Sequence, residues 1–361
     1  MFPADFAYAR ARSLDEALDL LDEAHAAGQE AKLIAGGQSL LPMMKLRLAA
    51  PEVLIDIAEL PGLSGGGGWM GSAAGGHLSY SIGALTTYRQ LARDPLLAGG
   101  ILRNRNENAV PRRAAGIPAV TDALAVLADP QVRARGTIGG AVAHGDPAAD
   151  LPAVLLALDA EVVIAGRPGR HEHKQSWSHI PRRPRNDKPP SVVRQTMLLD
   201  DFLQGIYATD LAEDEVVTHV KITSRAGRAS AYEKFPHPAS HLPLAGVAVA
   251  VEFNGGTYTD EQGNVTDLND GSIARAAIAV TGISPRPYRA RAAEAVLKGA
   301  FPAPEALAAA AAQVTMASPG SADRVSLLGD QHASADYRAH LAEVLTRRAL
   351  AKALTRGGRN S

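Results

Sequence analysis

The chain has 361 residues, 46% of them hydrophobic and 21% charged, and its formal net charge is −1. This composition is that of a globular protein of two or three domains, and it excludes disorder throughout the chain and recruitment of nucleic acid by overall charge. The lack of any cysteine excludes disulfides, a cysteine nucleophile and a cysteine-ligated iron–sulfur cluster, and it agrees with a cytoplasmic location. No run of about 18 apolar residues occurs, so we expect no membrane insertion.

The first 60 residues predict a small α/β unit. Ser13 and Glu16 have the spacing of a capping box, apolar residues then recur at helical spacing, and Gly28 is placed to end the helix. We expect short apolar strands over residues 31–36 and 53–57. Between them, residues 42–49 predict a short helix or turn.

The middle of the chain predicts strands and helices joined by long loops. The Gly/Ser-rich residues 64–82 predict a loop or hairpin, and residues 98–118 an irregular segment. Asp146 is expected to cap a helix that starts at Pro147 and runs to about Leu158. The other expected elements are a strand and helix over 81–92, a helix over 123–129, strands over 161–165 and 215–222, and a basic loop over 167–194.

The last third predicts a separate domain of long antiparallel strands and helices. We expect the strands within 231–253 and 273–290, and the helices over 290–299, 304–316 and 334–354. The predicted division is therefore a first domain of residues 1–225, with subdomains of about 1–60 and 61–225, and a C-terminal domain of residues 226–356.

Two glycine pairs are candidates for phosphate binding. In residues 35–42 the pair follows a predicted strand, so that successive N–H groups can converge on a phosphate, and Ser39 adds a hydroxyl donor. Residues 137–150 repeat the pair after a strand-like segment and add two carboxylates, Asp146 and Asp150, that can accept from ribose hydroxyls or a flavin N–H. The simpler alternatives are tight turns and, for Asp146, a helix cap. Neither segment has the Rossmann or Walker A spacing.

Five blocks of sequence then point to one family. AGGQSLLPMMKLRLAAPEVLIDI, ADPQVRARGTIGGAVAHGDPAADLPAVLLALDAEVVI, YEKFPHPASHLPLAGVAVAV, AAIAVTGISPRPYRA and HASADYRAHLAEVLTRRAL resemble, in this order, the FAD-binding medium subunit of the carbon monoxide dehydrogenase/xanthine dehydrogenase (molybdenum hydroxylase) family. The blocks cover well over half of the chain. The resemblance implies an α+β protein: an FAD-binding fold of the vanillyl-alcohol-oxidase (PCMH) type with two FAD-binding subdomains, plus a C-terminal α+β domain like that of the carbon monoxide dehydrogenase flavoprotein.

The resemblance also implies a set of cofactor-binding residues. The set contains two lysines: Lys32, beside the first loop, and Lys234, near the isoalloxazine ring, where a cation would stabilise reduced flavin. The alternative for Lys234 is a solvated lysine at a strand end. The full set is Lys32, Ala35, Gly36, Gly37, Gln38, Ser39, Leu40, Thr137, Ile138, Gly139, Gly140, Asp146, Asp150 and Lys234.

The function implied is electron transfer. In this family a molybdopterin-binding large subunit oxidises the substrate, 2Fe–2S clusters in a small subunit carry the electrons, and FAD in the medium subunit passes them to an external acceptor, in a dimer of heterotrimers. The missing cysteines agree with clusters in another chain. We expect no catalytic acid, base or nucleophile here, no metal site and no nucleic-acid partner. The alternatives are a stand-alone FAD oxidoreductase on the same fold and a structural subunit that has lost FAD.

Overall fold

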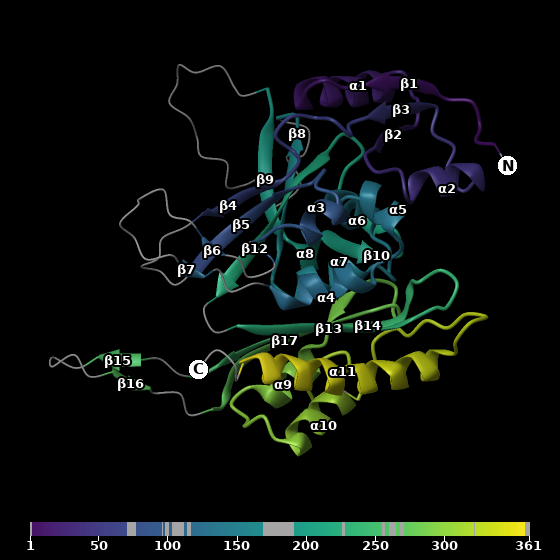
Figure 1. The fold of residues 1–361 in the computed structure, drawn as a ribbon. Coiled ribbons are helices and arrows are strands. Elements are labelled where there is room, and N and C mark those ends of the chain that lie inside the picture. The colour runs from purple at the N-terminus through teal and green to yellow at the C-terminus, as the bar shows by residue number, and fades with distance from the viewer. Residues whose placement is uncertain are drawn as a thin grey trace.

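The computed structural model describes residues 2–70, 77–95, 97, 101–102, 112–113, 117–168, 191–225, 228–254, 257–259, 265–267, 271–320 and 322–357. The predicted irregular segment at 98–118 and basic loop at 167–194 lie largely outside these ranges. Figure 1 shows three units stacked in chain order, with the N-terminal unit at one end and the C-terminal unit at the other. Within the described ranges, no helix combines the length and the apolar composition needed to cross a membrane.

The N-terminal unit is the predicted small α/β unit. Its three strands pair in parallel in the order β1-β3-β2. Ser13 caps the first helix by accepting from the Glu16 N–H, and Gly28 follows the helix with φ +70°, as the capping pattern predicts. The elements are β1 (Ala7–Arg10), α1 (Leu14–Ala26), β2 (Ala31–Ile34), α2 (Leu40–Lys45) and β3 (Val53–Asp56).

The middle unit is built on an antiparallel sheet of order β4-β5-β12-β8-β9. The predicted hairpin at 64–82 is confirmed, because β4 (Gly66–Met70) pairs with β5 (His77–Gly83). The other strands of the sheet are β8 (Glu161–Gly166), β9 (Val193–Leu198) and β12 (Val216–Arg225), and short pairs join β6 (Ile101–Leu102) to β7 (Arg112–Arg113) and β10 (Leu203–Gly205) to β11 (Ala208–Thr209). The helices are α3 (Tyr88–Ala92), α4 (Pro118–Val126), α5 (Pro130–Arg135), α6 (Ile138–His144), α7 (Asp150–Ala157) and α8 (Leu199–Phe202).

Two sequence expectations about this unit are wrong. The helix expected to start at Pro147 starts at Asp150 instead, and Asp146 forms a tight turn by accepting from the Ala148 N–H at 2.8 Å. The second glycine pair does not follow a strand. It lies inside α6, which Thr137 caps through its side chain.

The C-terminal unit is an antiparallel sheet of order β13-β14-β17-β18 covered by helices on both faces. Every residue from Pro243 to Val251 is buried, because alternate side chains enter two different cores. Ala248 and Ala250 pack toward α4 and α7, whereas Val247 and Val249 pack with α11. The elements are β13 (Ala229–Pro236), β14 (Pro243–Phe253), β15 (Thr257–Thr259), β16 (Val265–Asp267), β17 (Ile273–Thr281), β18 (Tyr288–Arg289), α9 (Arg291–Leu297), α10 (Pro304–Ala312) and α11 (Ala335–Gly357).

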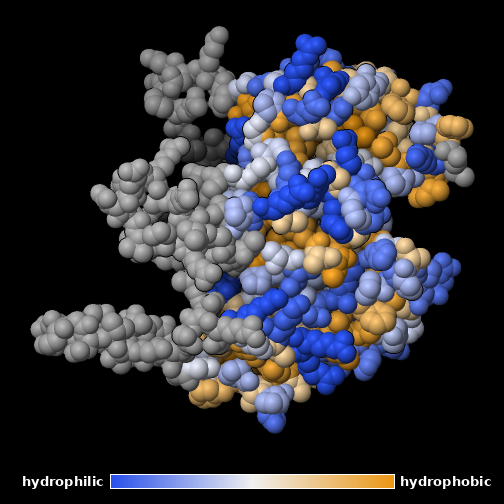
Figure 2. Space-filling view, in the orientation of Figure 1, coloured by the Kyte–Doolittle hydropathy of each residue, from blue (hydrophilic) through white to orange (hydrophobic). Residues whose placement is uncertain are grey.

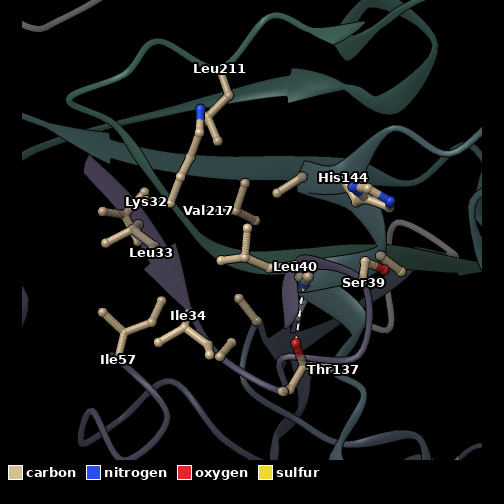
Figure 3. Close-up of a pocket in the computed structure, with 18 of the residues that line it drawn as sticks. Lys32, Leu33, Ile34, Ser39, Leu40, Ile57, Thr137, His144, Leu211 and Val217 are labelled. Atoms are coloured by element: carbon tan, nitrogen blue, oxygen red, sulfur yellow. Dashed lines mark hydrogen bonds between the residues drawn. The ribbon is translucent and has the colours of Figure 1, made fainter. Parts of the chain in front are cut away.

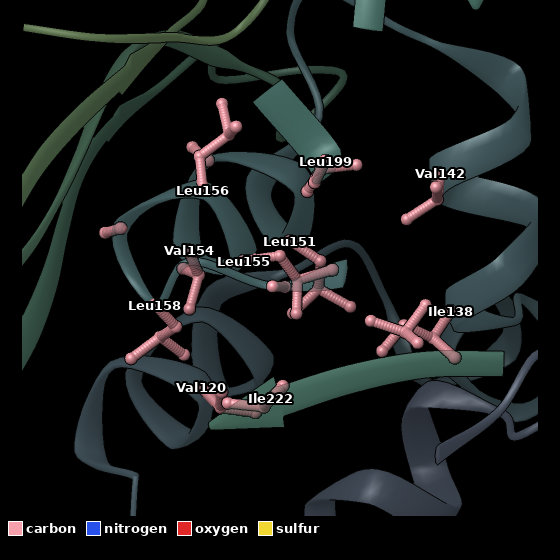
Figure 4. Close-up of a cluster of buried hydrophobic side chains, with 14 of the residues drawn as sticks. Val120, Ile138, Val142, Leu151, Val154, Leu155, Leu156, Leu158, Leu199 and Ile222 are labelled. Atoms are coloured by element: carbon pink, nitrogen blue, oxygen red, sulfur yellow. The ribbon is translucent and has the colours of Figure 1, made fainter. Parts of the chain in front are cut away.

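The largest core joins the middle and C-terminal units. Figure 4 shows its centre, where Leu151 and Leu155 of α7 lie close to Ile138 and Val142 of α6. The same cluster includes Tyr232 and alanines from β14 and β17. We therefore expect the two units to unfold together, because unfolding either one alone would expose the apolar side chains of the shared core to water at a high cost in free energy.

Arg167 links the middle unit to α1 of the N-terminal unit. It follows β8, and its guanidinium donates to the Asp15 side chain and carbonyl, both at 2.9 Å, and to the Asp19 carboxylate. The hydrogen bond from Arg167 lowers the pKa of Asp15. A lowered pKa means that this stabilisation is present above the ordinary aspartate pKa and is lost as the pH falls through the lowered value.

We expect Arg167→Ala to lower the free energy of unfolding by about 1 kcal/mol at neutral pH, because its carboxylate partners are largely exposed. High salt should shrink the loss. Urea unfolding at low and high salt measures both effects. The matched control is Arg10→Ala, whose pair with Glu59 is exposed on both sides and lies within one unit. An equal loss in the two variants would contradict a special role for the Arg167 link.

Candidate cofactor site

A pocket of about 530 Å³ lies between the N-terminal and middle units. Figure 3 shows Lys32, Leu33 and Ile34 of β2 along one side, with Ser39, Thr137 and His144 on the other. This volume is in the range of small-molecule and cofactor sites. Ten of the fourteen residues predicted from the sequence line it: Lys32, Ala35, Gly36, Gly37, Gln38, Ser39, Leu40, Thr137, Gly139 and Gly140.

The first glycine loop presents unused hydrogen-bond donors. The backbone N–H groups of residues 36–39 bond to no described residue. Gly36 and Gly37 are half-buried, and N–H groups shielded from water normally have a partner. Gly37 has φ +72°, which an L side chain rarely adopts. A Cβ on Gly36 would overlap the carbonyl oxygen of Arg135. The loop is therefore packed against the end of α5, and its unused donors belong to residues that line the pocket.

The backbone N–H groups at the second glycine pair already donate to other groups of the protein. Ile138 N–H donates to the Thr86 carbonyl at 3.0 Å and Gly139 N–H to the Ala84 carbonyl at 2.8 Å. Gly140 N–H donates to the Thr137 hydroxyl at 3.1 Å, the dashed line in Figure 3. The contribution of this segment is therefore close packing: a Cβ on Gly139 would overlap that of Ala84. Ile138 points into the core and does not line the pocket.

Asp150 and Lys234 form a buried ion pair that does not line the pocket. The Lys234 Nζ lies 3.0 Å from the Asp150 carboxylate and also donates to the Val126 carbonyl at 3.2 Å. The Tyr232 hydroxyl donates to Asp150 at 2.7 Å. Only 2% of the Lys234 side chain is exposed, so the alternative of a solvated lysine at a strand end is wrong.

The charge of Asp150 nevertheless acts on Tyr88, a residue of the pocket wall. Burial, followed by the charges of Asp150 and Asp146, raises the pKa of Tyr88, whose side chain lines the pocket. Burial also raises the pKa of Asp150, although Lys234 and the Tyr232 hydroxyl oppose this effect. Asp146 itself does not line the pocket and lies in the turn between α6 and α7.

Two aromatic side chains that the sequence did not single out also line the pocket. The rings of His144 and Tyr207 lie 4.9 Å apart and are tilted by 37°. Tyr207 has φ +51° and is 55% exposed, which is unusual for a large aromatic residue. In the sequence, the signal near Tyr207 is Gly205, which is typical of a turn. In the structure, Tyr207 lies in the turn between β10 and β11. Apolar side chains also line the pocket, namely Leu21, Leu33, Ile57, Leu211, Val216 and Val217.

Comparisons with known proteins identify the family of the chain. The family described as FAD binding domain in molybdopterin dehydrogenase matches residues 4–176, and the family described as CO dehydrogenase flavoprotein C-terminal domain matches residues 230–353. The chain is 33% identical to the carbon monoxide dehydrogenase medium chain of Hydrogenophaga pseudoflava, over 99% of both chains. It is 32% identical to the nicotine 6-hydroxylase medium subunit of Paenarthrobacter nicotinovorans, over 96% of both. A solved structure of the Hydrogenophaga pseudoflava enzyme superposes with a TM-score of 0.75 over 99% of each chain.

Proposed function

Because the chain belongs to the FAD-binding medium subunits of the carbon monoxide dehydrogenase/xanthine dehydrogenase family of oxidoreductases, we propose that it passes electrons from the 2Fe–2S clusters of a partner subunit to an external acceptor. FAD is its cofactor, and when bound it accepts electrons singly and delivers them in pairs. The observation that carries the proposal is the loop of residues 36–39, whose N–H groups lie at the pocket without an acceptor among the described residues.

The residues present fit this cofactor. The free N–H groups of the first loop, with the Ser39 hydroxyl, would hold the diphosphate, and Lys32 would offset its charge. The apolar side chains of the pocket suit adenine, and the aromatic rings of Tyr207 and His144 suit the isoalloxazine ring. Asp150 would act on bound flavin through its charge near Tyr88, with Lys234 as its counter-ion. Ile138 and Asp146, which do not line the pocket, would support α6 at its two ends.

The partners we propose are a molybdopterin-binding large subunit and a 2Fe–2S small subunit, assembled as a dimer of heterotrimers. A chain without cysteine cannot hold such clusters itself. Figure 2 shows apolar side chains exposed on the N-terminal unit near α2, where Phe2, Leu46 and Leu48 are mostly exposed. Exposed apolar groups of this kind favour a subunit of a complex over a free enzyme.

We also propose the domain division at residues 225 and 226. The strand β12 ends at Arg225 and completes the middle sheet, whereas β13 opens the C-terminal sheet. The two FAD-binding subdomains, about 1–60 and 61–225, then face each other across the pocket. The C-terminal domain, 226–356, supplies the partner residues of Asp150.

The first test is the visible spectrum of the purified chain after incubation with FAD and gel filtration. We expect flavin absorption to stay with the protein, and a reduced 2Fe–2S small subunit to bleach it under anaerobic conditions. Flavin that binds but is not bleached by any cluster-bearing partner would favour the stand-alone oxidoreductase. A chain that stays colourless with its partners present would leave only the structural subunit.

A further inference from the structure

His144 is the only histidine among the described residues that line the pocket. It is the last residue of α6, and its half-buried ring lies against the ring of Tyr207. Neither ring nitrogen makes a hydrogen bond to a described residue. An imidazole packed at a pocket wall, with both nitrogens unused by the described part of its own chain, is available to a ligand or to a proton.

The surroundings of His144 favour the neutral imidazole. Burial lowers its pKa, and the charge of Asp146 works in the opposite direction. The Tyr207 phenol, which faces the ring, is neutral near pH 7, because burial and then the charge of Asp146 raise its pKa. The other ionisable side chains described on the pocket wall or on elements packed against α6 include acidic, basic and phenolic groups. They are Lys32, Tyr88, Glu213 and Glu215 on the wall, Asp150 on α7, Asp210 beside β11, and His219 and Lys221 on β12.

We propose that His144 takes up a proton when flavin in this pocket is reduced, an inference that rests on the proposed function. Two electrons, from a one-electron donor such as a 2Fe–2S cluster, and one proton convert FAD to anionic reduced flavin. The negative charge that appears in the pocket favours imidazolium, so a second proton enters from solvent and stays on His144. By linkage, a protonated His144 makes the flavin easier to reduce.

The test is the pH dependence of the flavin midpoint potential in the FAD-loaded full chain. With one proton per two electrons the potential falls by about 30 mV per pH unit, and with two protons by about 59 mV. We expect the steeper slope in the unaltered protein over part of the range between about pH 5 and 8. His144→Gln should bring the slope down to the shallower value.

His219→Gln is the matched control. His219 is also half-buried, and burial, with the charges of Arg194 and Lys221, lowers its pKa. It lies on β12 and does not line the pocket, so this variant should keep the slope of the unaltered protein. Equal slopes in the unaltered protein and in His144→Gln would overturn the proposal. A chain that binds no FAD would instead overturn the proposed function, and the two failures are therefore distinct.

If His144→Gln does not bind FAD, a second variant and a direct measurement still test the proposal. His144→Phe keeps a ring against Tyr207 but cannot carry a proton, and it should show the same shallow slope. In the unaltered protein, NMR of 15N-labelled histidine should show the His144 pKa rising when the flavin is reduced, while that of His219 stays in place. A His144 pKa that does not depend on the flavin redox state would overturn the proposal without any variant.

Discussion

Gly36→Ala is expected to abolish tight FAD binding. The new methyl group would overlap the Arg135 carbonyl oxygen, which is backbone and cannot rotate away. The first loop must then move from the end of α5 and carry its free N–H groups out of register with the diphosphate. Losing one or two hydrogen bonds to a charged group costs about 3 kcal/mol, or roughly 100-fold in affinity. Overpacking should also lower the free energy of unfolding by about 1–3 kcal/mol.

Fluorescence titration of FAD and urea unfolding measure these two effects separately. Gly205→Ala is the matched control, because a Cβ there meets nothing closer than the Ala208 Cβ at 3.9 Å. It should bind FAD normally and change the unfolding free energy by less than about 0.5 kcal/mol. Normal FAD affinity in Gly36→Ala would show that the contact between the first glycine loop and the end of α5 does not shape the site.

Local patterns were sufficient to predict much of the fold. The first helix follows from Ser13, Glu16 and Gly28, because capping and helix termination depend on a few neighbouring residues. The start of α7 could not be predicted in the same way. Asp146 and Pro147 have the local pattern of a helix start, but Thr281 of β17 donates to the Pro147 carbonyl at 2.8 Å and thereby fixes the turn from a distant strand.

The second glycine pair illustrates the same limit at the site. Glycine disfavours helices, so a loop was the natural expectation for residues 137–140. The helix forms because Thr137 caps it, and Gly139 is needed where α6 touches Ala84. Tyr207 comes to the pocket from a turn far along the chain from α6. Such a contact depends on the closed tertiary structure, and no local pattern in the sequence encodes it.

Lys234→Met is expected to be the most destabilising single change in the C-terminal unit. It removes the cation beside Asp150 and leaves a carboxylate buried with only the Tyr232 hydroxyl as a partner among the described side chains. Breaking a buried ion pair on one side costs about 3–5 kcal/mol. The loss should depend on pH. Burial already raises the pKa of Asp150 and Lys234 opposes this, so the pKa must rise further in the variant.

A raised pKa in the folded state means that the contribution of Asp150 to stability is full below the ordinary aspartate pKa and is lost as the pH rises through the raised value. Lys234→Met should therefore regain part of its stability between about pH 7 and pH 5, as measured by urea unfolding. Adding Asp150→Asn should also restore part of the stability at neutral pH, because the buried group is then uncharged.

Lys352→Met is the control, because Lys352 pairs with Asp122 and Glu233 but is 35% exposed. This variant should lose about 1 kcal/mol or less. A loss in Lys234→Met that is independent of pH would mean that Asp150 is already protonated beside Lys234, and that the pair is held by hydrogen bonds and not by charge.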